Sequence, residues 1–472
     1  MKKLILIIFL ISNIICFSQE TLVNHINQNI KGGDIFSIND ELASEKYEGR
    51  LSGTTGFDLA ADYVANIFKE YKISPILNYK QSFPLNYTKT YEASLELFFN
   101  NNTSLKCQYY RDFAPMSFCG SGNLESEIVF AGYGISAPEY GYDDFKDIDV
   151  KGKVVMIIKG CPKAKNGEDW SKYDSHRFRT KNTREHGASG LIYVYTDEPG
   201  ANPNGDFIKD FPIVEFRKSL ADSIFSNYNL NTNNLKVLLN QRKNISFKLD
   251  IKCKLGVKSE NFDSKGYNVI GYIEGSDSLL KNEFIVIGAH LDHCGKWPIL
   301  ISGADDNASG SATVIEIAKC LSLLPEKPKR SIAFILFGGE EMGMLGSDYF
   351  IKNIPKKMTK INYMINLDMI GVGPDMFVKR LHNYKNIEDL FIKSKDIFSL
   401  KCGIEGSKED AISYGGDDFY FLQNNIPSIT FFSTGGKRNG YHTPGDNIYW
   451  ITPKIMEDIA KIITYTSYNL AN

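Results

Sequence analysis

Two hydrophobic patterns alternate along the second half of the chain. Short, almost continuous apolar runs are separated by stretches in which apolar residues recur at the spacing of an amphipathic helix. These patterns predict strands at 284–289, 331–337, 363–369 and 428–433, and helices at 309–324 and 453–468. Continuous apolar strands alternating with helices are typical of a mostly parallel sheet covered on both faces. We therefore predict an α/β domain over 255–472, with its ligands at the carboxyl edge of the sheet.

The first half of the chain carries different patterns. Apolar residues at helical spacing predict an amphipathic helix over 55–71, which we assign to an N-terminal part of the same domain, 19–84. Between residues 85 and 254, short apolar runs are separated by Gly, Pro and Asp, and one helical pattern covers 181–186. This predicts a mainly β domain with a few helices, inserted into the first domain.

The N-terminus has the layout of a secretory signal peptide. Two lysines precede an apolar run over 4–15, and small residues precede Gln19. This predicts that residues 1–18 are removed by cleavage after Ser18 and that the protein is exported, to the periplasm or the extracellular space. A membrane anchor is one alternative, but the run is shorter than the roughly 20 residues that cross a bilayer. A lipoprotein site at Cys16 is another, and the residues before it match such a site poorly.

The composition limits the kinds of partner that the protein is expected to bind and the kinds of cysteine chemistry that are expected of it. The net charge is −2, with 54 basic and 56 acidic residues, so nothing indicates binding to nucleic acid or an anionic membrane. No later apolar stretch is long enough to cross a membrane. Without Cys16, seven of the eight cysteines remain, so at least one is unpaired, and no CxxC pair indicates a zinc knuckle. An exported chain could form a disulfide such as Cys107–Cys119.

Acids and histidines gather at the ends of the predicted strands. They are His290 and Asp292, then Asp305 and Asp306 ahead of a helix, then Glu340 and Glu341, Asp368, and His442 after a Gly-rich loop. Each has an ordinary interpretation alone, since an Asp before a helix is usually an N-cap. Together they would meet at one edge of a parallel sheet and repel one another without a cation. Imidazole and carboxylate donors suit zinc, and two histidines with three carboxylates suffice for two adjacent ions.

These segments resemble the M28 family of zinc metallopeptidases. The matching segments are GAHLDH at 288–293, GADDNASG at 303–310, FGGEE at 337–341, NLDMIG at 366–371 and YHTP at 441–444. The start of the chain is similar to the start of the family at 48–53. The middle stretch is similar to an inserted protease-associated domain, through 132–134, 149–155 and 186–188. The resemblance implies a zinc-exopeptidase fold and hydrolysis of peptides from their free N-termini.

The resemblance also implies a ligand set for two Zn²⁺ ions. His290 would bind one ion and His442 the other, while Asp306 would bridge both. Glu341 and Asp368 would complete one ligand set each.

Two further residues have implied roles in catalysis. Glu340 would act as the general base toward a metal-bridging water, and Asp292 would orient His290 through its ring nitrogen. The family also has a cis peptide bond after the bridging aspartate, which falls between Asp306 and Asn307 here.

One segment departs from the family pattern. Many relatives carry Ser-Asp-His before an Ile-Pro pair, and this chain has Gly416-Asp417-Asp418 there, so the histidine is absent. We expect Asp417 to support the site near His442.

Alternatives stay open on the same fold. A carboxypeptidase or dipeptidase would need a basic group for the substrate carboxylate, which Lys437-Arg438 could supply. A glutaminyl cyclase typically uses a single zinc, and a non-catalytic scaffold should have lost Glu340 or several ligands, so the complete set argues against both. Trp297 and residues 437–441 are expected to line the substrate pocket.

Two neighbours of the first histidine are interpreted as structural. His293 is expected to be a structural or surface residue. Cys294 is interpreted as a buried thiol, with a place beside the metal ligands as the alternative.

Overall fold

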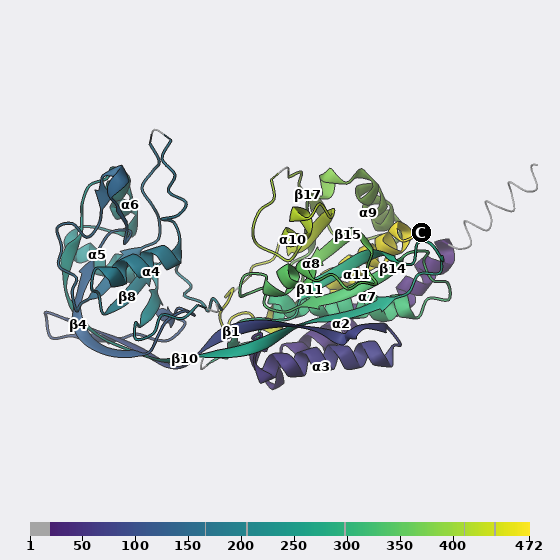
Figure 1. Ribbon diagram of the computed structural model, residues 1–472, viewed down its shortest axis with the longest axis horizontal. Helices are drawn as coiled ribbons and strands as arrows, with labels where there is room; N and C mark the ends of the chain where they lie inside the picture. Colours follow the sequence, from purple (N-terminus) through teal and green to yellow (C-terminus); the bar gives the residue numbers. More distant parts are fainter. Residues whose placement is uncertain (1–18, 166, 204–205, 297–298, 410, 439) are drawn as a thin grey trace, which may run out of the picture.

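The protein consists of two lobes joined by a long twisted pair of strands (Figure 1). The computed structural model describes residues 19–472 apart from 166, 204–205, 297–298, 410 and 439. The predicted signal peptide, 1–18, and Trp297 therefore lie outside the described residues. The predicted α/β class with a mostly parallel central sheet is confirmed.

The larger lobe is built on one end of a single sheet. Its strands, in spatial order, are β17 (Ile404–Gly406), β16 (Asp375–Lys379), β18 (Ser428–Thr434), β15 (Lys360–Leu367), β11 (Glu283–His290), β14 (Ser331–Phe337) and β10 (Phe247–Ile273). The neighbours β18, β15, β11 and β14 are parallel, so their carboxyl ends leave the sheet at the same edge. The predicted strands 284–289, 331–337 and 428–433 fall within these elements, whereas the predicted strand 363–369 extends two residues beyond the end of β15 at Leu367.

Helices cover both faces of this sheet because the strand residues are apolar on both sides. One face is covered by α2 (Gly32–Leu42), α3 (Thr55–Glu70), α7 (Gly310–Ser322), α9 (Lys385–Ile397) and α11 (Pro453–Leu470). The other face is covered by α8 (Leu345–Lys352) and α10 (Asp418–Gln423). Along β14, Phe334 packs with the first group and Phe337 with the second, so the pleat divides its side chains between two cores.

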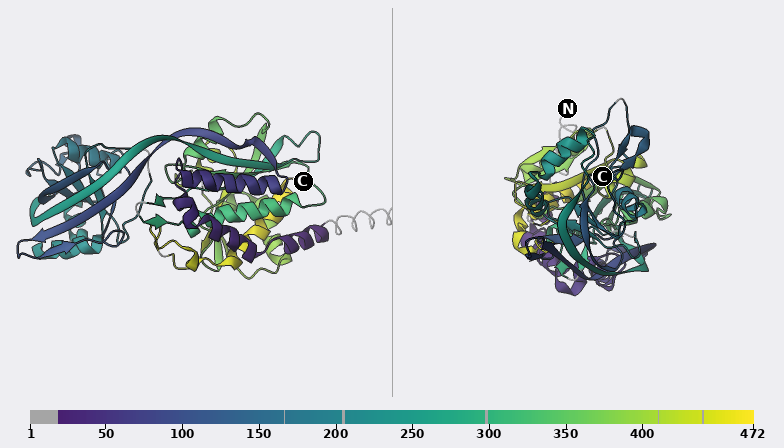
Figure 2. Two further views of the ribbon diagram at one scale, coloured as in Figure 1. Left: turned by 90° about the horizontal axis from the view of Figure 1, so that it is seen from below. Right: turned by 90° about the vertical axis from the view of Figure 1, so that its left-hand side faces the viewer.

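The two lobes share a continuous antiparallel ribbon (Figure 2). Strand β1 (Ser74–Phe99) pairs with β10 along almost its whole length, from Ser74 opposite Tyr272 to Phe99 opposite Ile251. The predicted boundaries at 84/85 and 254/255 lie inside these two strands. The lobes are therefore connected by hydrogen-bonded sheet and not by loose linkers.

The smaller lobe continues the same sheet and has its own core. Its strands are β2 (Ser104–Lys106), β3 (Phe113–Pro115), β4 (Gly122–Phe130), β7 (Val154–Ile158), β8 (Gly190–Val194) and β9 (Ile213–Phe216), with β5 (Ser136–Ala137) and β6 (Tyr142–Asp143) as a separate pair. Its helices are α4 (His176–Glu185), α5 (Lys218–Phe225) and α6 (Thr232–Asn240). Strands β4, β7, β8 and β9 are parallel.

Two sequence-based expectations can be compared with the described part of the chain. No helix there combines the length and the apolar character that a bilayer crossing requires. No two of the cysteines described are joined by a disulfide, so the suggested Cys107–Cys119 bond is absent.

Arg50 ties the N-terminal segment to the loops at the carboxyl edge of the sheet. The side chain is completely buried. Its guanidinium donates to the carbonyls of Leu291, Ser302 and Gly303 at 2.8, 2.8 and 2.9 Å, and to Leu42 at 2.6 Å. Leu291 follows β11, and Gly303 follows the short pair β12 (Gly295–Lys296) and β13 (Leu300–Ile301). The guanidinium of Arg50 therefore bonds to three segments at once: the end of α2, the loop after β11 and the loop after β13.

Replacing Arg50 by Met should destabilise the fold strongly. Four carbonyls, three of them in buried bonds, would lose a charged donor, and each such bond contributes about 1.5–3 kcal/mol. We expect the free energy of unfolding to fall by at least about 3 kcal/mol, measured by urea denaturation. The matched control is Arg184→Met on the exposed face of α4, for which a change below about 0.5 kcal/mol is expected. Equal midpoints for the two variants would contradict the role of Arg50.

Candidate active site

The carboxyl edge of the sheet collects the predicted site residues. His290 is the last residue of β11, the two glutamates follow β14, and Asp368 follows β15. His442 lies in the loop after β18, and Asp306 lies in the turn Ala304–Ser309 that leads into α7. The peptide bond between Asp306 and Asn307 is cis, as the resemblance implied.

The carboxylate of Asp306 faces two groups of donors. Its Oδ1 lies 3.3 Å from His290 Nε2, which is also 3.5 Å from Asp368 Oδ1. Its Oδ2 lies 3.3 Å from His442 Nε2, which is also 2.9 Å from Glu341 Oε2. All five side chains are at most 14% exposed. The structure thus brings the five predicted ligands together, in two groups that share one carboxylate.

The electrostatics of the site favour cations within these groups. His442 Nδ1 is buried and forms no hydrogen bond with the described residues, while His442 Nε2 and Asp368 Oδ1 have only the site's own charged groups as neighbours, Glu341 and Asp306 for the first and His290 for the second. Burial raises the pKa of Asp368 and, well above its ordinary value, the pKa of Glu340. Buried acids and imidazoles of this kind are stabilised by a bound metal, and the donors are those that zinc prefers. The residues present therefore fit two metal ions.

The two predicted catalytic residues lie directly beside the ligands. Asp292 Oδ1 accepts a hydrogen bond of 3.2 Å from the backbone N–H of Glu340. The Nδ1 atom of His290 is 3.1 Å from the backbone carbonyl of Asp292 and 3.8 Å from its carboxylate. Asp292 therefore orients His290 mainly through its backbone, while its side chain fixes the loop that carries Glu340.

The peptidase portion of the chain matches a known family. Residues 268–467 match the model of peptidase family M28. This part of the protein belongs to that family. The predicted peptide substrates follow, because a peptidase acts on peptide bonds. The prediction of an M28 hydrolase is therefore confirmed.

Individual relatives agree with this assignment. The chain is 26% identical over 380 residues to the aminopeptidase YwaD of Bacillus subtilis, covering 76% of this chain and 70% of the relative. That relative is named an aminopeptidase, which agrees with the predicted enzyme class, a metallo-aminopeptidase.

Solved structures share the whole two-lobed fold. An aminopeptidase from Aneurinibacillus sp. strain AM-1 superposes with a TM-score of 0.68 at 22% identity, covering 95% of this chain and 96% of that one. A zinc aminopeptidase from Bacillus subtilis superposes with a TM-score of 0.64 at 20% identity, covering 94% and 96%. Both matches extend over the smaller lobe as well as the M28 domain.

Asp446, which the sequence analysis missed, anchors the turn that carries the shared carboxylate. Its Oδ1 and Oδ2 accept the backbone N–H groups of Asp305 and Asp306 at 2.8 and 3.0 Å. Since Asp446 lies four residues after His442, it ties the His442 loop to the Asp306 turn. No periodicity or spacing distinguishes this aspartate from a surface residue in the sequence.

Arg438 has a structural role in the M28 domain. Its Nε donates to Asp305 Oδ2 at 2.7 Å, and its Nη2 donates to the carbonyls of Met369 and Ser433 at 2.6 and 2.7 Å. Lys437 beside it is exposed. The guanidinium that could have received a substrate carboxylate is therefore already engaged by the loops around the site.

The segment that departs from the M28 pattern forms its own ion pair. Asp418, which stands in place of the family's histidine, pairs with the buried Arg380 at 2.7 Å. Asp417 next to it is buried, and burial raises the pKa of its carboxyl to about 7, while the charge of His290 lowers it. The expected supporting role of Asp417 near His442 stays a prediction.

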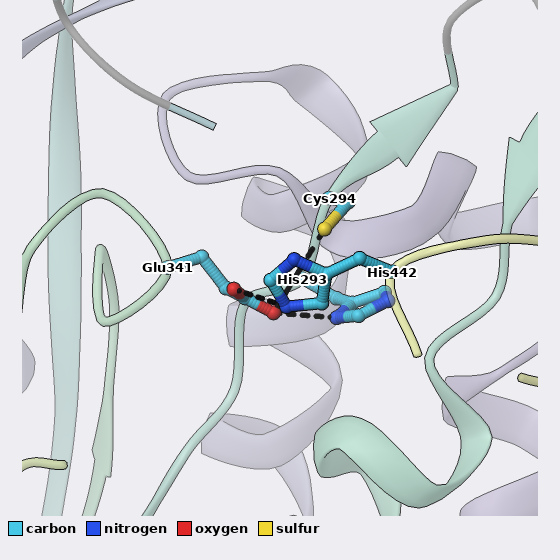
Figure 3. Close-up of side chains that lie close together, drawn as sticks. All are labelled: His293, Cys294, Glu341 and His442. Atoms are coloured by element: carbon cyan, nitrogen blue, oxygen red, sulfur yellow. Dashed lines mark hydrogen bonds and ion pairs between the residues drawn. The ribbon is translucent and has the colours of Figure 1, made fainter. Parts of the chain in front are cut away.

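The two residues that follow Asp292, His293 and Cys294, lie beside the donors His442 and Glu341 (Figure 3). His293 is completely buried, and its Nδ1 lies 2.6 Å from Glu341 Oε1. The Cys294 Sγ lies 3.9 Å from the same oxygen. His293 is therefore not a surface residue, and its ring contacts a predicted metal ligand.

The smaller lobe also reaches the site. Ala201, in the connection between β8 and β9, donates its backbone N–H to the carbonyl of His442 at 2.8 Å. The carbonyl of Ala201 lies 3.6 Å from Cys294 Sγ. Within the 437–441 loop, the Tyr441 ring stacks on His442 at a centroid distance of 3.8 Å.

Replacing Asp446 by Ala should weaken metal binding. Two backbone N–H groups beside Asp306 would lose their acceptors, and supporting residues of this kind typically contribute about 10–100-fold to metal affinity. We expect a loss of zinc affinity in that range, measured by competition with a chelator of known affinity. The control is Asp348→Ala on α8, where Asp348 pairs with Lys352 at the surface. Equal affinities for the two variants would argue against the anchoring role.

Proposed function

We propose that this protein is a two-zinc aminopeptidase that releases the N-terminal residue from peptides. The observation that carries the proposal is the shared carboxylate of Asp306, whose two oxygens face separate histidines at 3.3 Å each. A carboxylate between two donor groups is the arrangement that a pair of adjacent metal ions requires.

The proposed ligands divide between the two ions. His290 and Asp368 would hold one ion, His442 and Glu341 the other, and Asp306 would be common to both. Bound zinc ions would polarise the scissile carbonyl and make water a better nucleophile at neutral pH. Zinc is supported by the imidazole and carboxylate donors and by the zinc aminopeptidase of Bacillus subtilis that shares the fold.

Glu340 is the proposed general base. Its backbone is held by Asp292, whereas no hydrogen bond or ion pair with the described residues engages its side chain. The carboxylate is therefore available to take a proton from the attacking water and to deliver it to the leaving amine. Burial raises the pKa of Glu340, which suits a group that must accept and then release a proton.

The charge of the site supports recognition of a free N-terminus. Asp368 and Asp417 add buried negative charge close to Glu340, and an amine is attracted to such a surface. Arg438, which a carboxypeptidase or dipeptidase could use for the substrate carboxylate, is held by Asp305. The complete set of five ligands argues against a single-zinc glutaminyl cyclase and against a non-catalytic scaffold.

The test compares aminoacyl-p-nitroanilides with their N-acetylated counterparts, using purified protein. We expect hydrolysis of the free amines only, loss of activity on treatment with a chelator, and recovery on addition of zinc. Hydrolysis of N-acylated substrates with a free carboxylate, and of none of the free amines, would favour a carboxypeptidase. Activity that survives removal of all metal would contradict the proposal.

Glu340→Gln separates catalysis from metal binding. The amide cannot accept the proton of water, and loss of a general base typically lowers kcat by about 10²–10⁴-fold. We expect such a loss with two zinc ions still bound, as measured by metal analysis. Glu341→Gln, which changes a proposed ligand, should instead reduce the zinc content. Full activity of Glu340→Gln would exclude this residue as the base.

We propose further that the protein is exported after removal of residues 1–18. The charged start, the apolar run over 4–15 and the small residues before Gln19 support this. Expression of the full chain should give a periplasmic or extracellular protein whose mature N-terminus, determined by mass spectrometry, is Gln19. Retention of Met1 on a cytoplasmic product would contradict it.

The smaller lobe is proposed to be a protease-associated domain. Support comes from the segments 132–134, 149–155 and 186–188, and from its insertion between β1 and β10. Through Ala201 the lobe contacts both His442 and Cys294. This contact would allow it to shape one side of the substrate site.

A further inference from the structure

Four side chains converge where the loop after β11 meets the His442 loop (Figure 3). They are His293, Cys294, Glu341 and His442, and one ligand atom from each lies within 4.8 Å of all the others. Three of these residues offer the nitrogen and oxygen donors already discussed. Cys294 adds a sulfur donor, which the set of ligands implied by the family resemblance does not contain.

The surroundings of Cys294 differ from those of an ordinary core thiol. Cys294 is completely buried, and apolar neighbours such as Leu51, Ile301 and Met342 cover part of it. Its Sγ nevertheless faces polar atoms, at 3.9 Å from Glu341 Oε1 and 3.6 Å from the carbonyl of Ala201. The side chain therefore points into the polar centre of the site and not into the apolar core.

The two imidazoles of this cluster have ring nitrogens that a metal could use. His442 Nε2 lies 2.9 Å from Glu341 Oε2 and 3.3 Å from Asp306 Oδ2. His442 Nδ1 and His293 Nε2 are buried without a hydrogen-bond partner in the described part of the chain. Buried imidazole nitrogens require a partner, and a cation among the four side chains would supply one. The convergence of His442 Nε2 on two carboxylates and the direction of the Cys294 thiol are independent observations that indicate a metal at the same place.

We propose that Cys294 is a thiolate ligand of the metal ion held by Glu341 and His442, a role that rests on the two-metal site proposed above. The two metal positions would then differ in the type of donor atoms that they offer. The position of His290 and Asp368 offers only nitrogen and oxygen, whereas the position of His442 adds a soft sulfur donor. Thiolate ligation favours zinc over magnesium or manganese, and a thiol that binds a metal releases its proton.

The test loads the metal-free full-length protein with cobalt(II) chloride and records absorption spectra. A sulfur–cobalt bond gives a charge-transfer band in the near ultraviolet, which nitrogen and oxygen ligands do not produce. We expect this band in the wild-type protein and its absence in Cys294→Ala. The control is Cys320→Ala in α7, whose thiol packs in the core of the M28 domain and should leave the band unchanged.

Zinc affinity distinguishes a ligand from a supporting residue. In Cys294→Ala, one of the two zinc affinities should fall by more than about 100-fold, beyond the about 10–100-fold that supporting residues typically contribute. Far-UV circular dichroism of the metal-free variant verifies its fold. Zinc X-ray absorption of the wild-type protein requires no variant and should reveal a sulfur neighbour at about 2.3 Å.

The outcomes separate this inference from the proposed function. Two bound zinc ions and full peptidase activity, with no charge-transfer band and no sulfur neighbour, would overturn the thiolate ligand alone. Failure of the wild-type protein to bind any metal would overturn the proposed function and this inference together. A band that survives in Cys294→Ala would assign the sulfur ligand to another cysteine and would also overturn the proposal.

Discussion

Burial of carboxylates at one edge of the sheet is the constraint on which the site depends. Asp292, Asp306, Asp368, Asp417 and the two glutamates lie close together with little access to water, an arrangement that is unfavourable unless positive charge is near. Arginines supply part of that charge from the periphery, each through specific bonds: Arg50 to carbonyls, Arg380 to Asp418 and Arg438 to Asp305. None of these three is bonded to Asp306. The centre of the cluster is left to cations that the protein must bind from solution.

The loops around this centre are linked to one another by hydrogen bonds. Asp446 joins the His442 loop to the Asp306 turn, and Asn307 joins that turn to the end of β15 through the carbonyl of Leu367 at 2.8 Å. Arg50 adds the N-terminal segment. A metal site needs its donors positioned to within a fraction of an ångström, and separate loops would not provide this. Hydrogen bonds between loops that are distant in sequence give the edge of the sheet the rigidity of a packed element.

The sequence was sufficient to predict the sheet and the edge at which acids and histidines gather, because both follow from local patterns. Continuous apolar runs marked β11, β14, β15 and β18, and most of the predicted ligands follow the ends of those runs. The domain boundaries were harder to predict from the sequence. Strands β1 and β10 keep the alternating pattern of a strand across both lobes and have no break at residues 84 or 254. The roles of Asp446, Arg438 and His293 depend on contacts across more than forty residues, which no local pattern encodes.

The burial of charge at this edge of the sheet also explains why the smaller lobe contacts the site at His442. Electrostatic interactions gain strength where water is excluded, so a charged cluster benefits from cover. His442 stands on a loop and not at the end of a strand. Ala201 supplies that cover by bonding to the backbone of His442 and contacting Cys294, and the rigid ribbon of β1 and β10 holds the lobe that carries it. Insertion of the second lobe into the chain through paired strands, and not through flexible linkers, is what allows such a precise contact over a long distance.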